Sequence, residues 1–271
     1  MMKPFQAALY SLIIVVMGCG TATKTTTPSA APETRESLYA RGHALYAEGR
    51  HDSAMVYLER SRSLDPTYLP PLNDLAEIYY VAGATGQESE REKNMRAALG
   101  CYAAIDSLGH GNEATFDRLT ELSHNLGETG LFLSYSEKQV RLYPGDRQLY
   151  NLGLAYFGSG NFQKVVDTQK GAIGKYPHSP YIAGFYRLLG DAYFSIDRQQ
   201  SAERTYEEGL HAVDKSVKGM KEANPGFIET AEYRQLAGNY KAMLASLKKI
   251  YRLHGKQERL RELESRPDVD P

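Results

Sequence analysis

Two carboxylates in one predicted helical segment are the side chains best placed to do chemistry. Asp117 and Glu121 are four residues apart, a spacing that puts both on one face of a helix. His124 follows on the same segment, and Arg187 lies further along the chain. Paired carboxylates of this kind sometimes act as general acid and general base. The same pattern is more typical of a solvated polar surface, so an enzyme is only the alternative interpretation.

The chain contains none of the sequence motifs that would make an enzyme or a cofactor site the first expectation. It has no phosphate-binding glycine loop, no H-E-x-x-H and no G-x-S-x-G. Its seven histidines are scattered without metal-ligand spacing. Cys101 has no evident base to activate it and is expected to be an inert, partly buried thiol. We therefore predict a non-catalytic protein with no cofactor and no metal site.

Cys19 differs from Cys101 because it follows an apolar N-terminal segment. Lys3 is the only charged residue before residue 24, and residues 5–17 are almost wholly apolar. Such a run is too short to span a membrane and fits the apolar region of a secretory signal peptide. The sequence Val-Met-Gly-Cys that ends at Cys19 resembles the lipobox of bacterial lipoproteins.

The lipobox resemblance implies cleavage between Gly18 and Cys19 and lipidation of Cys19, with residues 1–18 as the signal peptide. Residues 19–34, which are rich in Thr, Ala and Pro, would then form a flexible tether. Gly20 rather than Asp follows the cysteine, which by the same resemblance favours the outer membrane. We expect a lipid-anchored protein of the bacterial cell envelope that faces the periplasm.

The composition of the 271-residue chain is that of a globular protein. It is 42% hydrophobic and 24% charged, which is too apolar for a disordered chain. The formal net charge of −1 gives no general attraction for nucleic acid. Two cysteines exclude a disulfide-rich scaffold. The 20 tyrosines, in a chain without Trp, need a separate explanation.

Residues 38–66 carry a spaced pattern that returns along the chain. Numbered from Arg35 as position 1, small residues occupy positions 8 and 20 (Gly42 and Ala54), and Pro66 occupies position 32. Small residues at 8 and 20 let two helices approach closely, a glycine at 15 ends the first helix, and a proline at 32 ends the second. The pattern resembles the tetratricopeptide repeat (TPR), a helix-turn-helix unit of about 34 residues.

The same pattern predicts six repeats over residues 35–257. Three match strongly, at 35–68, 146–179 and 183–216, and three match more weakly, at 69–112, 113–145 and 224–257. The resemblance implies an all-α fold, an α-solenoid whose repeats form a right-handed superhelix. Residues 258–271 are expected to form a C-terminal extension that is partly disordered.

The intervals between repeats predict where the array is irregular. Position 8 recurs at intervals of 34, 44, 33, 37 and 41 residues. We expect the excess residues to lie in loops, above all in an insertion of about ten residues between Thr85 and Asn94. Gly238, at position 15 of the sixth repeat, is expected to end the first helix of that repeat.

The TPR resemblance also implies a binding surface. In TPR proteins the first helices of the repeats line the concave face, and positions 2, 5, 9, 12 and 13 point into it. Carried over to this chain, these positions give a predicted peptide groove: Tyr39, His43, Tyr46, Asn73, Glu77, Tyr80, Asp117, Glu121, His124, Arg147, Tyr150, Phe157, Arg187, Asp191 and Phe194. The Lys and Asn that hold a carboxylate in chaperone-binding TPR domains are absent, because Tyr39 and His43 stand at those positions.

Position 12 carries a ring in five successive repeats: Tyr46, Tyr80, His124, Phe157 and Phe194. Rigid rings provide contact area at low entropic cost, so this row suits an extended peptide or a helix. The alternative, which the sequence supports equally, is that the rings pack against neighbouring helices. Other tyrosines fall at packing positions between repeats: Tyr79, Tyr102, Tyr156, Tyr193 and Tyr206.

Charge is distributed unevenly along the chain. Residues 33–110 carry 12 acidic and 8 basic side chains, whereas residues 215–266 carry 6 acidic and 12 basic ones. The C-terminal excess of basic residues could attract anionic lipid headgroups or an acidic partner. A solvated outer face of a capping helix is the more ordinary interpretation.

Together these features predict a lipid-anchored scaffold that binds a protein or peptide partner in the concave groove. The segment at residues 175–181 resembles turns of envelope TPR proteins, which implies a role in outer-membrane assembly, secretion or pilus biogenesis. The alternative is an envelope enzyme or glycan-binding protein with a polar site in the groove. No nucleic-acid partner is expected, and the oligomeric state stays open.

Overall fold

The structure, a computed structural model, describes residues 33–265 of the chain. Every regular element in that range is helical, which confirms the predicted all-α solenoid. The elements are α1 (Arg35–Ala47), α2 (His51–Leu64), α3 (Leu69–Thr85), α4 (Glu88–Ser107), α5 (Glu113–Asn125), α6 (Thr129–Leu142), α7 (Asp146–Gly158), α8 (Phe162–Lys175), α9 (Ile182–Ser195), α10 (Gln199–Ala223), the 3-10 helix η1 (Pro225–Glu229), α11 (Ala231–Leu253) and α12 (Gln257–Glu264). The predicted signal peptide, the lipidation site at Cys19 and most of the tether lie outside the described residues.

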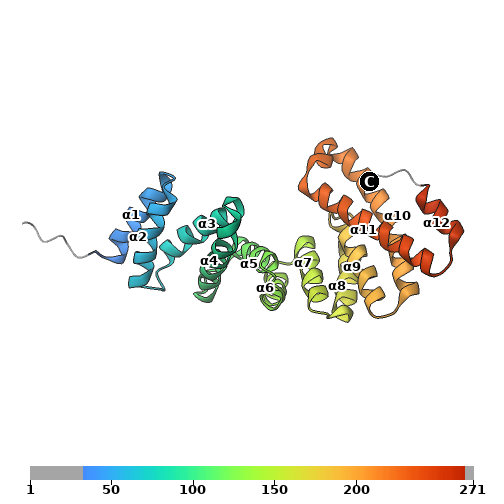
Figure 1. The fold of residues 1–271 in the computed structure, drawn as a ribbon, viewed down its shortest axis with the longest axis horizontal. Coiled ribbons are helices and arrows are strands. Elements are labelled where there is room, and N and C mark those ends of the chain that lie inside the picture. The colour runs from blue at the N-terminus through green and yellow to red at the C-terminus, as the bar shows by residue number, and fades with distance from the viewer. Residues whose placement is uncertain (1–32, 266–271) are drawn as a thin grey trace, which may run out of the picture. The chain divides into compact units, whose positions relative to one another are not determined.

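Helices α1 to α10 form five helix-turn-helix pairs that follow one another along the chain (Figure 1). The first helix of each pair packs on the second, and the second packs on the first helix of the next pair. The first helices also pack on one another in three places: α1 on α3, α7 on α9, and α9 on α11. Helix α5 makes no comparable contact with α3 or α7 within the described part of the chain.

The two helices of a repeat approach closely at position 8, as the repeat pattern predicts. In three repeats a glycine there lies against the residue sixteen positions further on: Gly42 against Leu58, Gly153 against Gln169, and Gly190 against Tyr206. A Cβ atom on Gly42 would lie 2.8 Å from the Leu58 side chain, well inside normal contact distance. Ala54 and Ala202, at position 20, are fully buried in the same contacts.

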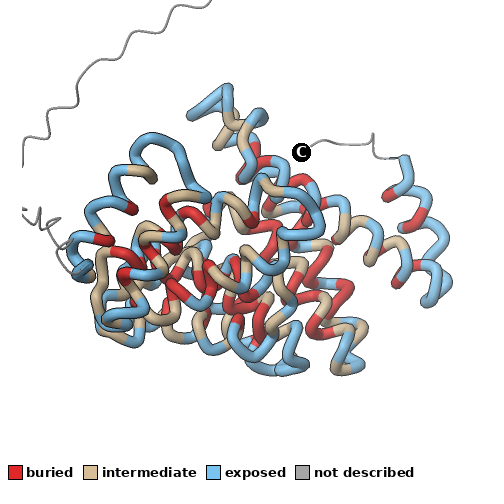
Figure 2. Tube along the Cα trace, turned by 60° about the vertical axis from the view of Figure 1, so that its left-hand side comes forward, coloured by how far each residue is buried: buried red, intermediate tan, exposed pale blue. Residues whose placement is uncertain are grey.

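The apolar core is divided into two clusters, one formed by α1–α5 and the other by α7–α12. Helix α6 lies between them, with Tyr135 against the first cluster and Leu133 against the second. The polar side chains of Gln139 and Gln148 are buried at this junction. Buried positions recur along the helices on both sides of it (Figure 2). The third and fourth repeats therefore meet through a more polar contact than the other repeats do.

The excess residues of the second repeat lie in a helix, which corrects the prediction of a loop insertion. Helix α4 already begins at Glu88, only three residues after α3 ends at Thr85. Glu, Arg and Lys favour the helical conformation, and three ion pairs on this segment are three or four residues apart. The charged segment therefore extends the second helix rather than forming a loop.

The sixth repeat also differs from the prediction. Gly238 does not end a helix, because it lies inside α11, which runs unbroken for 23 residues from Ala231 to Leu253. The apolar residues Leu236, Met243 and Leu247 stay on one buried face across this glycine. Their burial outweighs the helix propensity lost at Gly238, about 1 kcal/mol. The short helix α12 then follows and buries Leu260 and Leu263, so the extension after residue 257 begins as packed helix.

No helix among residues 33–265 combines the length and the apolar character that a bilayer-crossing segment requires.

The contact at position 8 can be tested with two glycine-to-alanine substitutions. Gly190→Ala should destabilise the fold by about 1–3 kcal/mol, because the new methyl group would overlap the Tyr206 ring. Gly171→Ala is the matched control, since Gly171 lies inside α8 with open space around it. That substitution should stabilise the helix by about 0.5–1 kcal/mol. Urea unfolding followed by circular dichroism gives the two midpoints, and a midpoint for Gly190→Ala at or above that of the unmodified chain would contradict the argument.

Candidate functional site

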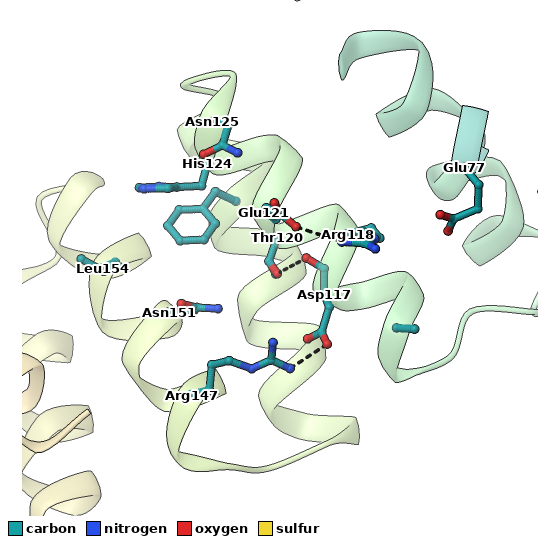
Figure 3. Close-up of a pocket in the computed structure, with 12 residues that line it drawn as sticks. Glu77, Asp117, Arg118, Thr120, Glu121, His124, Asn125, Arg147, Asn151 and Leu154 are labelled. Carbon is teal, nitrogen blue, oxygen red and sulfur yellow. Dashed lines mark hydrogen bonds and ion pairs between the residues drawn. The ribbon is translucent and has the colours of Figure 1, made fainter. Parts of the chain in front are cut away.

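A pocket of about 450 Å³ opens on the first helices, at the place where α5 is not packed directly on α3 or α7 (Figure 3). Five residues of the predicted groove line it: Glu77, Asp117, Glu121, His124 and Arg147. They come from the second, third and fourth repeats. The structure therefore brings together, in one place, predicted groove residues that are up to 70 residues apart in sequence.

The two carboxylates that could act as acid and base are each held by hydrogen-bond donors. Asp117 accepts hydrogen bonds of 2.6 Å from Gln139 Nε2 and 2.6 Å from Arg147 Nη2. Glu121 accepts the hydroxyl of Tyr80, which lies 2.9 and 3.0 Å from its two oxygens. These contacts tie α3, α5, α6 and α7 together. The pair is therefore part of the network that connects the repeats.

Tyr80 is fixed in place by α5. The guanidinium carbon of Arg118 lies 3.7 Å from the centroid of the Tyr80 ring, and Arg118 also pairs with Glu121 at 3.4 Å. Burial raises the pKa of the Tyr80 hydroxyl, and its hydrogen bond to Glu121 raises that pKa further. The hydroxyl therefore remains protonated, and remains a donor, at neutral pH.

Three polar side chains of this pocket have no hydrogen-bond partner among residues 33–265: His124, Asn125 and Asn151. Figure 3 shows Asn151 extending from α7 toward α5, between Arg147 and Leu154. The His124 ring packs on Phe132 with 4.8 Å between the centroids. Each asparagine amide offers donors and an acceptor on the same group. These side chains are free to bind a ligand that carries both hydrogen-bond donors and hydrogen-bond acceptors.

A second pocket, of about 210 Å³, lies among α7, α9, α10 and α11. Its apolar walls are Phe157, Phe194 and Ile250. Lys249 stands at the same pocket, with its ammonium nitrogen 5.6 Å from the centroid of the Phe194 ring. Within the described chain Lys249 makes no ion pair.

Asp191, which also lines the second pocket, is satisfied by its neighbours. It accepts a hydrogen bond of 2.6 Å from the Tyr206 hydroxyl and pairs with Arg187 at 3.0 Å. Burial raises the pKa of the Asp191 carboxyl above its ordinary value. Arg187 also donates to Asn239 at 2.6 Å, so its guanidinium binds α9 to α11. Neither predicted groove residue is free for a ligand.

Other residues of the predicted groove lie outside the two pockets. Tyr150 does not face an open groove, which corrects the prediction, because it is 5% exposed and stacks on Tyr181 at 5.5 Å. Asn73 is exposed. Tyr39, His43 and Tyr46 lie together on α1, where His43 Nδ1 contacts Asp74 Oδ2 at 2.7 Å. They form a third region, apart from the two pockets.

The position-12 rings do not stack on one another among the described residues. Three of them contact a ring of the second helix of their own repeat: Tyr46 with His51 at 5.6 Å, His124 with Phe132 at 4.8 Å, and Phe157 with Phe162 at 5.2 Å. The remaining two, Tyr80 and Phe194, contact cationic side chains of other repeats. Each ring thus packs against a neighbouring side chain. Phe157 and Phe194 in addition line the second pocket.

Sequence reasoning missed three pocket residues. Arg118 and Asn151 both occupy position 6 of their repeats, which was not among the positions assigned to the groove. Asp74, the partner of His43, occupies position 6 of the second repeat, so this position was the signal that could have found them. Lys249 comes from α11, a long helix that departs from the repeat pattern, so no repeat position predicts the direction of its side chains.

The comparisons with known proteins agree with the fold. Residues 36–68 match the family model of the tetratricopeptide repeat. A stretch of 64 residues, 24% of the chain, is 33% identical to protein O-mannosyl-transferase TMTC2 of Homo sapiens and 31% identical to the same protein of Mus musculus. The chain matches only 8% of the length of these relatives.

Two solved structures resemble the chain over most of its length. YrrB, described as a TPR protein with an unusual peptide-binding site, is 14% identical with a TM-score of 0.50, over 65% of this chain and 84% of its own. A MamA protein is 17% identical with a TM-score of 0.50, over 69% of this chain and 95% of its own. These likenesses concern the fold. The chain is an α-solenoid of TPR type.

Cys101 lies in the core formed by α1–α5 and is 1% exposed. Burial raises the pKa of its thiol to about 11. No group of three or more His, Cys, Asp and Glu side chains within the described residues could hold a metal ion. The thiol therefore lacks the two properties, access and a low pKa, that a nucleophile requires.

The buried thiol can be measured in a Cys19→Ser variant, in which Cys101 is the remaining cysteine. With a pKa of about 11, about 0.1% of the thiol is ionised at pH 8, against tens of per cent for an exposed cysteine. A chromogenic disulfide reagent should thus react at least about a hundredfold more slowly with the folded chain than with the same chain unfolded in guanidinium. Rates within tenfold of each other would show that Cys101 is accessible.

Proposed function

We propose that the chain is a non-catalytic scaffold that binds an extended peptide segment of a partner protein across the first helices of its second to fourth repeats. The observation that carries this proposal is the pocket at α5, where the side chains of Asn125, Asn151 and His124 have no hydrogen-bond partner among residues 33–265. A TPR array supports such a role because its helices present a long, preformed surface.

A peptide backbone is the ligand that best matches these side chains. Each peptide group carries one N–H donor and one C=O acceptor, and an asparagine amide pairs with both. Asp117 pairs with Arg147, and Glu121 pairs with Arg118, so neither of these two carboxylates demands a cationic ligand. The third carboxylate of the pocket, Glu77, accepts a hydrogen bond from the Tyr102 hydroxyl. The volume of about 450 Å³ accommodates a short stretch of chain rather than a whole folded element.

The same contacts count against the alternative, an enzyme or glycan-binding protein with Asp117 and Glu121 as its acid and base. General acid–base work needs at least one carboxylate that can reach a substrate proton. Asp117 accepts one hydrogen bond from the Gln139 amide and one from the Arg147 guanidinium. Both oxygens of Glu121 lie within hydrogen-bond distance of the Tyr80 hydroxyl. YrrB is described as having a peptide-binding site, which agrees with the proposal at the level of the fold only.

The proposal predicts a partner that can be captured at Asn125 and not on the second helices. A photoreactive benzoylphenylalanine placed at Asn125, which is exposed and lines the pocket, should crosslink to a discrete protein in cells. The matched control places the same residue at Gln163, which is exposed on α8 and lines neither pocket. The crosslinked peptide is then identified by mass spectrometry.

The captured peptide, once synthesised, gives the affinity test. Asn151→Leu keeps the size of the side chain and removes its donors and acceptor, so binding should weaken by at least about tenfold. Fluorescence anisotropy of the labelled peptide measures this change. Equal crosslinking from Asn125 and Gln163, or an Asn151→Leu variant with unchanged affinity, would refute peptide binding at this pocket.

We further propose that the array is anchored by lipid on Cys19 and faces the periplasm from the outer membrane, where a scaffold could serve assembly, secretion or pilus biogenesis. The apolar segment at residues 5–17 and the sequence that ends at Cys19 support this part of the proposal. More than one acyl chain on the same residue gives stable anchoring, whereas a single chain is marginal.

The anchor is tested by metabolic labelling with a radioactive fatty acid, followed by membrane fractionation. The unmodified chain should carry label, sediment with the outer membrane and lose residues 1–18. Cys19→Ser should carry no label and remain unprocessed, whereas the control Cys101→Ser should behave like the unmodified chain. Label retained by Cys19→Ser, or absent from both other proteins, would contradict lipidation at Cys19.

A further inference from the structure

The second pocket has a chemistry of its own. Phe157, Phe194 and Ile250 form its apolar walls, and its volume of about 210 Å³ is smaller than the roughly 300–1,000 Å³ of a small-molecule site. Asp191 and Tyr206 also line it but satisfy each other through a 2.6 Å hydrogen bond, and Ser195, Ser246 and Lys249 complete the lining. What remains open is an apolar space of the size of one large side chain.

The ammonium group of Lys249, an exposed residue, stands beside this space. Three other basic residues of the C-terminal region pair with carboxylates: Arg252 with Glu264, Lys256 with Glu203, and Arg259 with Glu207. Lys249 has no carboxylate partner among residues 33–265 and lies over the edge of the pocket, 5.6 Å from the Phe194 ring. A cation at the rim of an apolar pocket complements a ligand that carries a negative charge next to an apolar group.

We propose that this pocket is the anchor site for a partner segment with one large apolar side chain and an adjacent carboxylate, the apolar group lying between Phe157 and Phe194 and the carboxylate on Lys249. This inference rests on the proposed function and specifies the chemistry of the peptide. Helix α7 contributes to both pockets, through Asn151 to the first and Phe157 to the second. Six helical residues span about 9 Å, which an extended peptide covers in about three residues.

The charge distribution supports an acidic ligand over a neutral one. Residues 215–266 carry 12 basic and 6 acidic side chains, so the potential around α11 is positive beyond the contribution of Lys249 alone. At the first pocket both arginines are paired with carboxylates, Arg118 with Glu121 and Arg147 with Asp117, so no cation is left there to select an acidic ligand. In this proposal the first pocket binds the peptide backbone, and the second pocket binds one apolar and one acidic side chain of the same peptide.

The test selects ligands without assuming their sequence. A library of random twelve-residue peptides on phage is panned against the detergent-solubilised full chain, against Lys249→Glu, and against Lys218→Glu. Lys218 is the matched control, because it is exposed on α10 and lines neither pocket. The full chain and Lys218→Glu should enrich Phe, Tyr or Leu with Asp or Glu within two positions. Lys249→Glu should enrich Lys or Arg at the acidic position instead.

A synthetic peptide of the enriched sequence gives the magnitude. Its affinity should fall about five- to tenfold in Lys249→Glu and stay unchanged in Lys218→Glu. Ser195→Trp, which places a ring at the rim of the second pocket, should reduce binding by a similar factor. Enriched peptides with no apolar–acidic pattern, or a pattern that Lys249→Glu leaves unaltered, would overturn the inference and leave the proposed function standing if Asn151→Leu still weakens binding. No enrichment on the full chain would overturn both.

Discussion

The close contact between the two helices of each repeat, at position 8, is the constraint on which the array depends. Gly42, Gly153 and Gly190 place the first helix directly against a large side chain of the second. Because a single added methyl group would overlap that side chain, the spacing of the pair is set by the glycine. A fixed pair then presents its first helix at a constant orientation to the next pair. The surface made by the first helices is a consequence of this packing, repeated along the chain.

The site lies where this constraint is relaxed. In the third repeat position 8 is Thr120, which turns its hydroxyl back to the Phe116 carbonyl at 2.9 Å, and position 20 is Phe132 in place of a small residue. Both side chains line the first pocket. Here α5 does not pack on the neighbouring first helices, and Asp117 joins the third and fourth repeats through its polar contact to Arg147. A departure from the repeat pattern thus opens space and leaves polar groups available for a ligand.

Repeat spacing was sufficient to predict the all-α solenoid and the first five helix pairs, because each depends on small and large residues at fixed local positions. It did not predict the start of α4 or the unbroken α11. Helix propensity and local ion pairs determine that α4 begins at Glu88. Burial of the apolar face of α11 determines that this helix continues through Gly238. Of the candidate site, Asp117, Glu121 and His124 on α5 were predictable from the same spacing, whereas Arg118 on the same helix was not. Lys249 was not, because its position depends on how α11 packs across α9 and α10.

Three tyrosines, all at position 11 of their repeats, mediate the contact between one repeat and the repeat before. The Tyr79 hydroxyl donates to Glu59 at 3.0 Å and the Tyr156 hydroxyl to Glu137 at 2.8 Å, in both cases from position 11 of one repeat to position 25 of the repeat before. Burial, together with the carboxylate, raises the pKa of each of these two hydroxyls to about 12, so both remain donors.

An apolar contact alone permits one repeat to slide on the next, whereas a hydrogen bond to a charged acceptor is directional. The fourth and fifth repeats keep the contact with the charge reversed. Lys170 occupies position 25 there, and its ammonium nitrogen lies 5.7 Å from the centroid of the Tyr193 ring. These interfaces share a tyrosine whose apolar ring packs between the repeats and whose ring or hydroxyl contacts a charged side chain at position 25. Tyrosine provides both, whereas phenylalanine at position 11 would keep the packing and lose the hydrogen bond that sets the register.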